Sequence, residues 1–453
     1  MKPFTLREAL NAVEGRFVGN EAALDGVIDH VTSDSHLAGP GALFIPLKGT
    51  RVDGHDFMAD CISAGAVANL SEREPSPGEQ PAIVVDSTVR ATGALAAWYR
   101  SRFDIPVIGI TGSVGKTTTK EMIAAVLSQC FETHKTNKNL NNELGVPWTL
   151  MRLDDAHQVS VVEMGISDFG EMRWLTQIVR PSIAVFTVIG DAHLEFLGDR
   201  EGVMRAKSEI FEGMDAGGLA VLNGDDPIQR ACHPNMRRVT YGLGDGCDVR
   251  GSGVRSLGEE GICMTVCHPK GTFEVRIPAF GSHLPSAALA AAAVGLALGM
   301  SGDDIAHGIA RYQTVGDRAR VIHVRDMTVV SDCYNANPNS CQAAVDSLMQ
   351  LQGERRVCIL GDMLELGPRS EELHRGVGAY AARAGIDLVV GCGPLARAIA
   401  SGAMDAGGEV LYFEDKARLM ASLEDFVHPG DCVLVKASHS MAFEEVVERL
   451  TEQ

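Results

Sequence analysis

The stretch GITGSVGKTTTK, residues 109–120, indicates the end of an apolar strand, a glycine-rich turn and the start of a helix. It is similar to a phosphate-binding loop, whose usual pattern is Gly, four residues and then Gly-Lys-Ser/Thr. Counting back from the Gly-Lys-Thr of residues 115–117 places the first glycine at position 110, which is Ile110. Because strand, turn, Lys-Thr and helix follow in order, backbone N–H groups and a helix N-terminus would surround an anion. The stretch therefore predicts a nucleotide site with its own spacing, and not a turn that carries Gly-Lys-Thr by chance.

Each residue type in this loop suits a nucleotide. Gly112 and Gly115 permit a tight backbone path, and Thr111 takes part of the role of the missing early glycine. Lys116 can neutralise the β and γ phosphates, and the hydroxyl of Thr117 can ligate Mg²⁺. The predicted nucleotide contacts in the loop are Thr111, Gly112, Ser113, Val114, Gly115, Lys116, Thr117 and Thr118.

The composition is that of a soluble globular protein. The chain has 453 residues, of which 45% are hydrophobic and 22% are charged. This length suggests two to four domains of roughly 100–200 residues each. The net charge is −19, and no run of Lys and Arg occurs. Nucleic acid and anionic membranes are therefore disfavoured as partners.

Neither a secretion signal nor a membrane span is predicted. The start, MKPFTLREALNAVEGRF, has no apolar run and no small-residue cleavage site. Residues 284–300 are apolar but Ala-rich, so a buried helix is favoured over a membrane span. Eleven cysteines without paired spacing suit a reducing cytoplasm, and we expect a cytoplasmic protein. Cys263 and Cys267, followed by His268, are interpreted as residues of a strand and not as zinc ligands, because no second pair lies at a suitable distance.

The chain is expected to be α/β, with three domains. Residues 1–103 mix short apolar runs with turn signals and end in a helix at 87–103, which predicts a small α/β module. Residues 104–313 alternate strands and helices, which predicts a parallel sheet around the phosphate loop. Residues 314–453 restart the alternation and predict a second, Rossmann-like sheet. No Gly-x-Gly-x-x-Gly opens this last region, so a dinucleotide is not expected there.

The elements of the central region follow from short apolar runs. Strands are expected at 105–110, 159–164, 183–189 and 218–223, and short β-strands at 236–280. In the helix after the loop, the apolar residues on one face are Met122, Ile123, Val126 and Leu127.

Several further blocks carry chemistry-bearing residues. Glu163 ends the strand of VVEMG, at the edge where open parallel sheets bind ligands. The other blocks are SDSHLAGPGALFIPLKGTRVDGHDF (33–57), NKNLNNELGVPWTLM (137–151), DAHLEFLGDREGVMRAKSEI (191–210), TVGDRARVIHVRDMTVVSDCYNANPNS (314–340) and LGDMLELGPRSEELH (360–374).

With the loop, these blocks make nearly the whole chain resemble the Mur ligases, the cytoplasmic amide-bond-forming enzymes of peptidoglycan synthesis. The pattern is most similar to the family member that adds D-alanyl-D-alanine. The resemblance implies an ADP-forming ligase that uses ATP and Mg²⁺. It implies that residues 1–103 bind the UDP-sugar, that 104–313 bind ATP and that 314–453 complete the site.

The resemblance also implies a catalytic set of Lys116, Glu163, His193 and Lys207. Thr117, Glu163, His193 and Lys207 would contact the metal, with Lys207 as an N-carbamate that offers carboxylate-like oxygens to Mg²⁺. On pattern alone, a single Glu at the position of Glu163 is often only a helix-cap partner. An ordinary amphipathic helix, with Arg205 and Lys207 both facing solvent, also explains the stretch around them.

Nucleotide and substrate contacts are carried over in the same way. Arg318 would face the ATP phosphates and Asp332 the nucleotide, with Arg320 as a rival for Arg318. On pattern alone, several of the substrate positions are turn or cap signals. The implied substrate-binding residues are Ser35, Lys48, Asp53, Asn141, Asn142, Tyr334, Asn335 and Asn337.

The implied reaction joins D-alanyl-D-alanine to UDP-N-acetylmuramoyl-tripeptide through an acyl phosphate, in a monomeric enzyme. The chain departs from the family pattern in the motifs at residues 34–36, 281–286, 331–332 and 436–439. In the second of these, Leu284, Pro285 and Ser286 follow His283 where the family has the asparagines that commonly hold the adenine. These departures keep two alternatives open. One is a paralogous ligase with another amine or acyl acceptor, and the other is a nucleotide-binding regulator without turnover.

Overall fold

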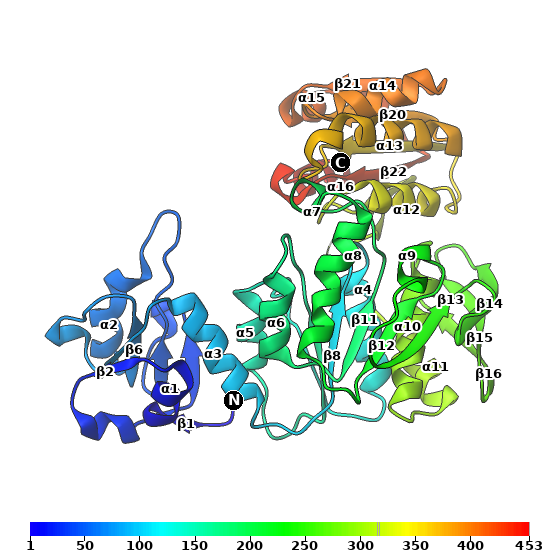
Figure 1. Ribbon diagram of the computed structural model, residues 1–453. Helices are drawn as coiled ribbons and strands as arrows, with labels where there is room; N and C mark the ends of the chain where they lie inside the picture. The colour runs from blue at the N-terminus through cyan, green and yellow to red at the C-terminus, as the bar shows by residue number, and fades with distance from the viewer. Residues whose placement is uncertain (315, 317, 453) are drawn as a thin grey trace.

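The computed structural model describes residues 1–314, 316 and 318–452. Three sheets occupy three consecutive stretches of the chain, and each forms the centre of an α/β domain (Figure 1). The predicted α/β class with three domains is confirmed. The limits 1–103, 104–313 and 314–453 stay predictions, and the last of them adjoins residues 315 and 317, which lie outside the described part.

The N-terminal domain is built on a five-stranded sheet of order β2-β7-β6-β5-β4, in which only the pair β2–β7 is antiparallel. A separate antiparallel pair joins β1 and β3. The strands are β1 (Phe4–Thr5), β2 (Arg16–Val18), β3 (Val27–Ile28), β4 (His30–Thr32), β5 (Ala42–Phe44), β6 (Ala68–Ser71) and β7 (Ala82–Val84). The helices are α1 (Leu6–Val13), α2 (Met58–Ser63) and α3 (Thr88–Arg100).

The central sheet has nine strands in the order β16-β15-β14-β13-β12-β11-β8-β10-β9. The run from β9 to β14 is parallel, and β15 and β16 extend it as an antiparallel hairpin. The strands are β8 (Val107–Thr111), β9 (Thr133–Lys135), β10 (Val159–Glu163), β11 (Ile183–Phe186), β12 (Leu219–Asn223), β13 (Arg237–Gly242), β14 (Val249–Ser256), β15 (Ile262–His268) and β16 (Gly271–Ile277). The strands expected from the four apolar runs and from residues 236–280 are thereby confirmed.

Helices cover both faces of this sheet. On one face α4, α10 and α11 pack together, and the four apolar residues predicted for one side of α4 are fully buried there. The helices are α4 (Lys116–Leu127), α5 (Gly145–Leu150), α6 (Glu171–Val179), α7 (Leu194–Leu197), α8 (Arg200–Ser208), α9 (Pro227–Arg230), α10 (Leu284–Ala297) and α11 (Gly302–Ala310). The Ala-rich stretch is the buried helix α10, and among the described residues no helix combines the length and apolarity that a membrane crossing requires.

The C-terminal sheet has the order β17-β18-β22-β19-β20-β21 and is parallel apart from β17. Separate apolar clusters lie on its two faces, one with α12, α13 and α14 and the other with α15 and α16, as a doubly wound sheet requires. The strands are β17 (Arg320–Val324), β18 (Met327–Ser331), β19 (Arg355–Gly361), β20 (Leu388–Cys392), β21 (Val410–Phe413) and β22 (Asp431–Lys436). The helices are α12 (Pro338–Leu348), α13 (Ser370–Ala384), α14 (Arg397–Asp405), α15 (Lys416–Phe426) and α16 (Glu444–Thr451).

Helix α3 joins the N-terminal domain to the central one, because it packs against α5 and α6. Tyr99 on α3 is fully buried, and its hydroxyl donates to the carbonyl of Leu153 at 2.6 Å and accepts from the N–H of Lys2 at 2.7 Å. One apolar cluster runs through both domains. Together these contacts fix α3 against the central domain.

We expect Gly308→Ala to destabilise the close contact between α11 and α4. An added Cβ at Gly308 would lie 2.4 Å from the Cα of Val126, a backbone atom that cannot rotate away. The free energy of unfolding should fall by about 1–3 kcal/mol, as in other overpacked sites, although alanine favours helices over glycine by about 1 kcal/mol. Denaturant titration measures the change.

The matched control is Gly376→Ala in α13, where an added Cβ meets nothing within 4 Å. That variant should be neutral or up to about 1 kcal/mol more stable. Equal stability of the two variants would contradict the backbone contact between α4 and α11.

Candidate functional site

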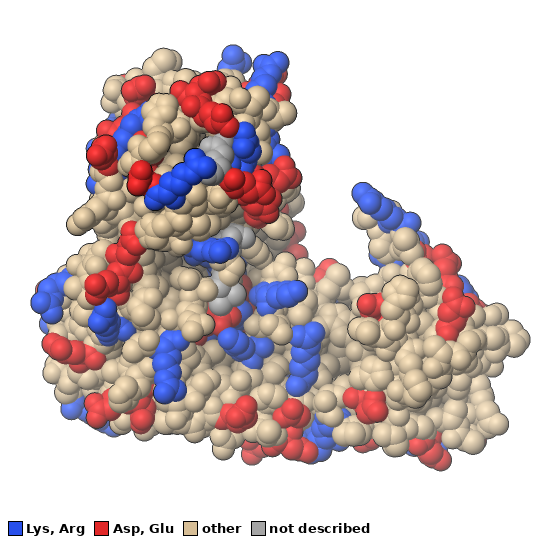
Figure 2. Space-filling view, turned by 180° about the vertical axis from the view of Figure 1, so that it is seen from behind, with Lys and Arg blue, Asp and Glu red and all other residues tan. Residues whose placement is uncertain are grey.

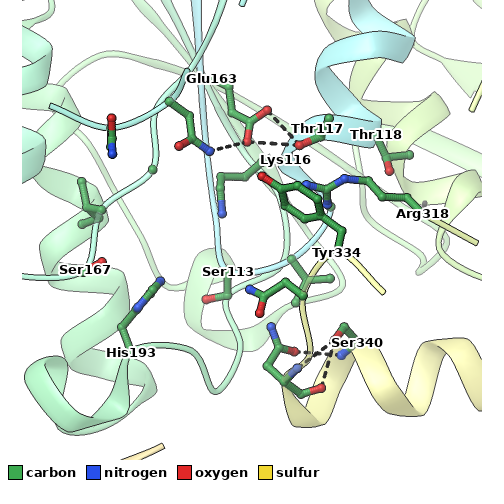
Figure 3. Close-up of a pocket in the computed structure, with 18 of the residues that line it drawn as sticks. Ser113, Lys116, Thr117, Thr118, Glu163, Ser167, His193, Arg318, Tyr334 and Ser340 are labelled. Carbon is green, nitrogen blue, oxygen red and sulfur yellow. Dashed lines mark hydrogen bonds between the residues drawn. The ribbon is translucent and has the colours of Figure 1, made fainter. Parts of the chain in front are cut away.

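A cavity of about 710 Å³ lies where the carboxyl end of β8 meets the C-terminal domain, and Arg90 of α3 in the N-terminal domain is one of its lining residues. Most of the predicted site residues line it, and Figure 3 shows several of them around one space. The predicted residues that line the cavity are Ser113, Val114, Gly115, Lys116, Thr117, Thr118, Asn141, Asn142, Glu163, His193, Arg318, Asp332, Tyr334, Asn335 and Asn337.

The phosphate loop follows the predicted strand–turn–helix path. Gly112 and Gly115 have φ values of 146° and 85°, and Lys116 opens α4. An added Cβ at Gly112 would lie 2.0 Å from the hydroxyl oxygen of Thr187, so the turn needs glycine there. The first turn of α4 leaves backbone N–H groups directed at the cavity, and its dipole favours an anion.

The ammonium group of Lys116 lies inside this loop. It donates to the carbonyl of Gly112 at 2.8 Å and points into the space between Glu163 and His193 (Figure 3). Its enclosed position lowers the pKa of Lys116, and the charge of Arg318 adds to this effect, whereas the carboxylate of Glu163 opposes it. A phosphate bound in the loop would bring negative charge close to this ammonium group.

Glu163, at the end of β10, carries a buried carboxylate held from several sides. It is 1% exposed. The Thr117 hydroxyl lies 3.0 Å and 3.2 Å from its two oxygens, and the amide of Asn141 donates to Oε1 at 2.8 Å. The ammonium of Lys120 lies 3.9 Å from Oε2. The alternative role of Glu163 as a helix cap finds no support in these contacts, because its partners are side chains that converge on the phosphate loop.

His193 lies across the cavity from Glu163, in a left-handed conformation with φ of 56°. Its Nδ1 is 2.6 Å from Oε2 of Glu365, on the C-terminal domain. Burial lowers the pKa of His193, and the charge of Lys207 adds to this effect, whereas Glu365 opposes it. The ring is therefore biased towards its neutral form, which can ligate a metal.

Lys207 is 1% exposed on α8, whereas Arg205 of the same helix is exposed. The alternative that both side chains face solvent is thus wrong for Lys207. Its ammonium has neither a hydrogen bond nor an ion pair within the described part of the chain. Burial holds the pKa of Lys207 well below its ordinary value, and the charge of Lys116 contributes, opposed by Glu171.

The C-terminal domain closes the other side of the cavity. The guanidinium carbon of Arg318 lies 3.9 Å from the ring centre of Tyr334, and the Tyr334 ring stacks on His439 at 5.6 Å between centres. Lys436 is buried and donates to Asp332 at 2.6 Å and to the carbonyl of Asn335 at 2.8 Å. Arg320, the rival of Arg318, begins β17 and does not line the cavity.

Two of the predicted asparagines also have local roles in the fold. The side chain of Asn142 accepts from the N–H groups of Leu144 and Gly145 at the start of α5. Asn337 caps α12 and accepts from the N–H of Ser340 at 2.9 Å. Asn337 is thus a helix cap and Asn142 a turn residue, as the local pattern indicates, and a substrate contact of either stays a prediction.

The three predicted UDP-sugar residues do not line the cavity. Ser35 begins a short 3₁₀ turn, and Lys48 pairs its backbone with Asp53, whose carboxylate accepts from the N–H of His55 at 3.0 Å. Figure 2 shows an open notch between the C-terminal lobe and the raised tip of the N-terminal domain. Their sugar-nucleotide role stays a prediction.

Some residues at or beside the cavity were not predicted from the sequence. Lys120, one turn after Lys116 on α4, does not line the cavity, but its ammonium lies 3.9 Å from Oε2 of Glu163. His283 lines the cavity in front of α10, where burial lowers its pKa and the charge of Asp332 opposes the effect. Arg90 and Trp174 line it from α3 and α6, and no local pattern marks them.

Family models match three consecutive stretches of the chain. The model described as "Mur ligase family, catalytic domain" matches residues 27–108, "Mur ligase middle domain" matches 110–295, and "Mur ligase, glutamate ligase domain" matches 311–439.

Full-length relatives agree with these models. The UDP-N-acetylmuramoyl-tripeptide–D-alanyl-D-alanine ligase of Bacillus subtilis (strain 168) is 37% identical over 99% of this chain and 98% of its own. A structure of MurF from Acinetobacter baumannii is 33% identical, with a TM-score of 0.93 and complete coverage of both chains.

Another structure from that organism is named as the UDP-N-acetylmuramoylalanyl-D-glutamyl-2,6-diaminopimelate–D-alanyl-D-alanyl ligase. It is 32% identical, with a TM-score of 0.86 over 100% of this chain and 99% of that one. MurF of Thermotoga maritima in complex with ADP is 29% identical, with a TM-score of 0.84 over 93% and 97% of the two chains. Since these matches extend over the whole length, the chain belongs to the Mur ligase family.

Proposed function

We propose that this protein joins D-alanyl-D-alanine to UDP-N-acetylmuramoyl-tripeptide with ATP and Mg²⁺, as a monomer in the cytoplasm. The observation that carries the proposal is one cavity in which the phosphate loop meets Arg318 and Tyr334 of the C-terminal domain. The full-length similarity to ligases of this name supports the choice of substrates.

The proposed reaction has two steps. The terminal carboxylate of the tripeptide attacks the γ-phosphorus of ATP, and ADP leaves. The amine of the dipeptide then attacks the acyl phosphate, phosphate leaves, an amide forms and the amine loses a proton. The backbone N–H groups of residues 112–118 and the ammonium of Lys116 hold the phosphates and balance charge on the transferred phosphoryl group.

The donor set around Glu163 fits Mg²⁺. A carboxylate and the Thr117 hydroxyl lie side by side at the phosphate loop. No group of three His, Cys, Asp or Glu side chains able to hold a metal occurs among the described residues. Mg²⁺ is commonly held by one or two carboxylates, water and substrate phosphates. Thr117 and Glu163 would hold the ion, which would balance phosphate charge, and His193 and Lys207 would complete the metal contacts.

The first test is phosphate release with ATP, Mg²⁺ and UDP-N-acetylmuramoyl-tripeptide, with and without D-alanyl-D-alanine. We expect release that depends on the dipeptide, because the acyl phosphate needs the amine to turn over. Mass spectrometry should detect the pentapeptide product.

Turnover only with another amine or acyl acceptor would replace the proposal with a paralogous ligase. ATP binding without any turnover would replace it with a nucleotide-binding regulator.

Glu163→Gln should keep the shape of the side chain and remove its charge. We expect kcat to fall by about 10²–10³-fold, the usual effect of losing one group that stabilises transition-state charge. Steady-state kinetics across Mg²⁺ concentrations measures the loss, and Glu143→Gln, an exposed carboxylate at the same cavity, is the control. An active Glu163→Gln protein with unchanged Mg²⁺ dependence would remove Glu163 from the metal site.

Lys207 is proposed to react with CO₂, so that its amine forms a carbamate and releases a proton. The buried side chain without an acid partner suits this change, since the product gains a negative charge near Lys116. Isotopically labelled bicarbonate should give a carbamate NMR signal that Lys207→Ala lacks. Full activity without such a signal would refute the carbamate.

A further inference from the structure

An arginine–tryptophan pair forms the wall of the cavity on the side of the N-terminal domain. The guanidinium carbon of Arg90, on α3, lies 4.9 Å from the ring centre of Trp174, on α6. Both residues line the same cavity as Lys116 and Glu163, whereas the Arg318–Tyr334 pair lines its C-terminal side. The Arg90–Trp174 pair therefore lies on the side of the cavity that is nearest to the N-terminal domain, and it shares the cavity with the phosphate loop.

The local packing of α3 makes room for this pair. Gly93 lies one turn after Arg90 on the same face of α3. An added Cβ at Gly93 would lie 2.5 Å from Cζ2 of Trp174. Only a glycine at this position allows the indole ring to lie against the helix, which sets the ring beside Arg90.

The guanidinium of Arg90 has no acid partner within the described part of the chain, and its N–H groups make no hydrogen bond there. Arg173 on α6 is different, because Glu212 accepts from its Nε at 2.6 Å. Glu171, the acid of this wall, accepts from the N–H of Ser167 at 2.7 Å. In a chain with a net charge of −19, Arg90 is thus a cation at the cavity whose donor edge is available to a ligand.

The position of the guanidinium over the Trp174 ring also favours one class of ligand for Arg90. A guanidinium that lies over an aromatic face keeps its N–H edge in one plane, the arrangement that binds a carboxylate with two parallel hydrogen bonds. Lysine offers no such fork. The ligand class is therefore a planar carboxylate, held beside an apolar ring.

We propose that Arg90 is a specificity-determining residue that binds a carboxylate of the acyl peptide other than the one that reacts. The name of the Acinetobacter baumannii ligase that is 32% identical includes a D-glutamyl residue before the last residue of its peptide substrate. A glutamyl residue in a peptide uses one of its two carboxyl groups in the chain and retains the other. The reacting terminal carboxylate must reach the phosphate loop, so the side carboxylate lies earlier along the peptide, towards the N-terminal domain and its wall. This inference rests on the proposed function.

The test compares Arg90→Gln with the unmodified enzyme in the ligation assay. We expect the KM for UDP-N-acetylmuramoyl-tripeptide to rise roughly 10- to 100-fold, the range for losing hydrogen bonds to a charged group. The KM values for ATP and D-alanyl-D-alanine should stay unchanged. Arg90→Lys, which keeps the charge but not the fork, should recover only part of the loss.

A second substrate isolates the carboxylate itself. A tripeptide nucleotide whose glutamyl side carboxylate is converted to an amide should bind the unmodified enzyme as weakly as Arg90→Gln binds the normal substrate. Arg90→Gln should not distinguish the two substrates. This lack of additivity is a readout that a merely structural role of Arg90 would not produce.

The matched control is Arg102→Gln. Arg102 also lies over a tryptophan, with its guanidinium carbon 5.1 Å from the ring centre of Trp98, but it does not line the cavity. Its KM values should equal those of the unmodified enzyme, and thermal unfolding should confirm that both variants are folded.

A higher KM for D-alanyl-D-alanine alone would overturn the assignment in favour of the carboxylate of the dipeptide. Unchanged KM values for all substrates would overturn it outright. Both results need an active unmodified enzyme, so they differ from failure of the proposed function, in which that enzyme shows no ligation at all.

Discussion

The buried carboxylate of Glu163 is the constraint around which the site is arranged. A charge that is 1% exposed needs partners, and Thr117, Asn141 and Lys120 supply them from the phosphate loop, the segment before α5 and the first turns of α4. Lys120 is itself buried and also donates to the carbonyl of Thr136 at 2.9 Å. The single carboxylate of Glu163 therefore links strand β10, helix α4 and the loop before α5.

The remaining parts of the site are supplied by the C-terminal domain, and polar contacts cross the junction. The N–H of Asp191 donates to Asn339 at 2.8 Å, and the N–H of Ser282 donates to the hydroxyl of Ser347 at 3.0 Å. His193 and Glu365 meet across the same junction. These contacts leave the cavity between the two domains and bring Arg318 to the phosphate loop, so neither domain forms the site alone.

The parts of the site that the sequence predicts are those in which function depends on neighbours in the chain. The phosphate loop follows from residues 109–120, and the position of Glu163 follows from the end of an apolar strand. Contacts between distant segments could not be predicted in this way. The local sequence around Lys120 does not show that Glu163, on β10, lies beside it. In the same way, nothing near Arg90 in the sequence indicates its contact with Trp174, which lies on α6. The burial of Lys207 likewise depends on how α8 packs, which its local pattern does not determine.

The apolar cluster shared through α3 has a consequence for synthesis on the ribosome. Its buried residues run from Phe4 to Leu222, so part of the apolar packing of the N-terminal domain is completed only by residues of the central domain. A second cluster, from Ala38 to Ala82, lies within the N-terminal domain and needs no later residue. Domains generally fold as units during translation, but here the cluster shared through α3 is complete only after the central domain has been made. The C-terminal domain follows last: one face of its sheet has an apolar cluster of its own, and the cluster on the other face takes in Phe280 of the central domain.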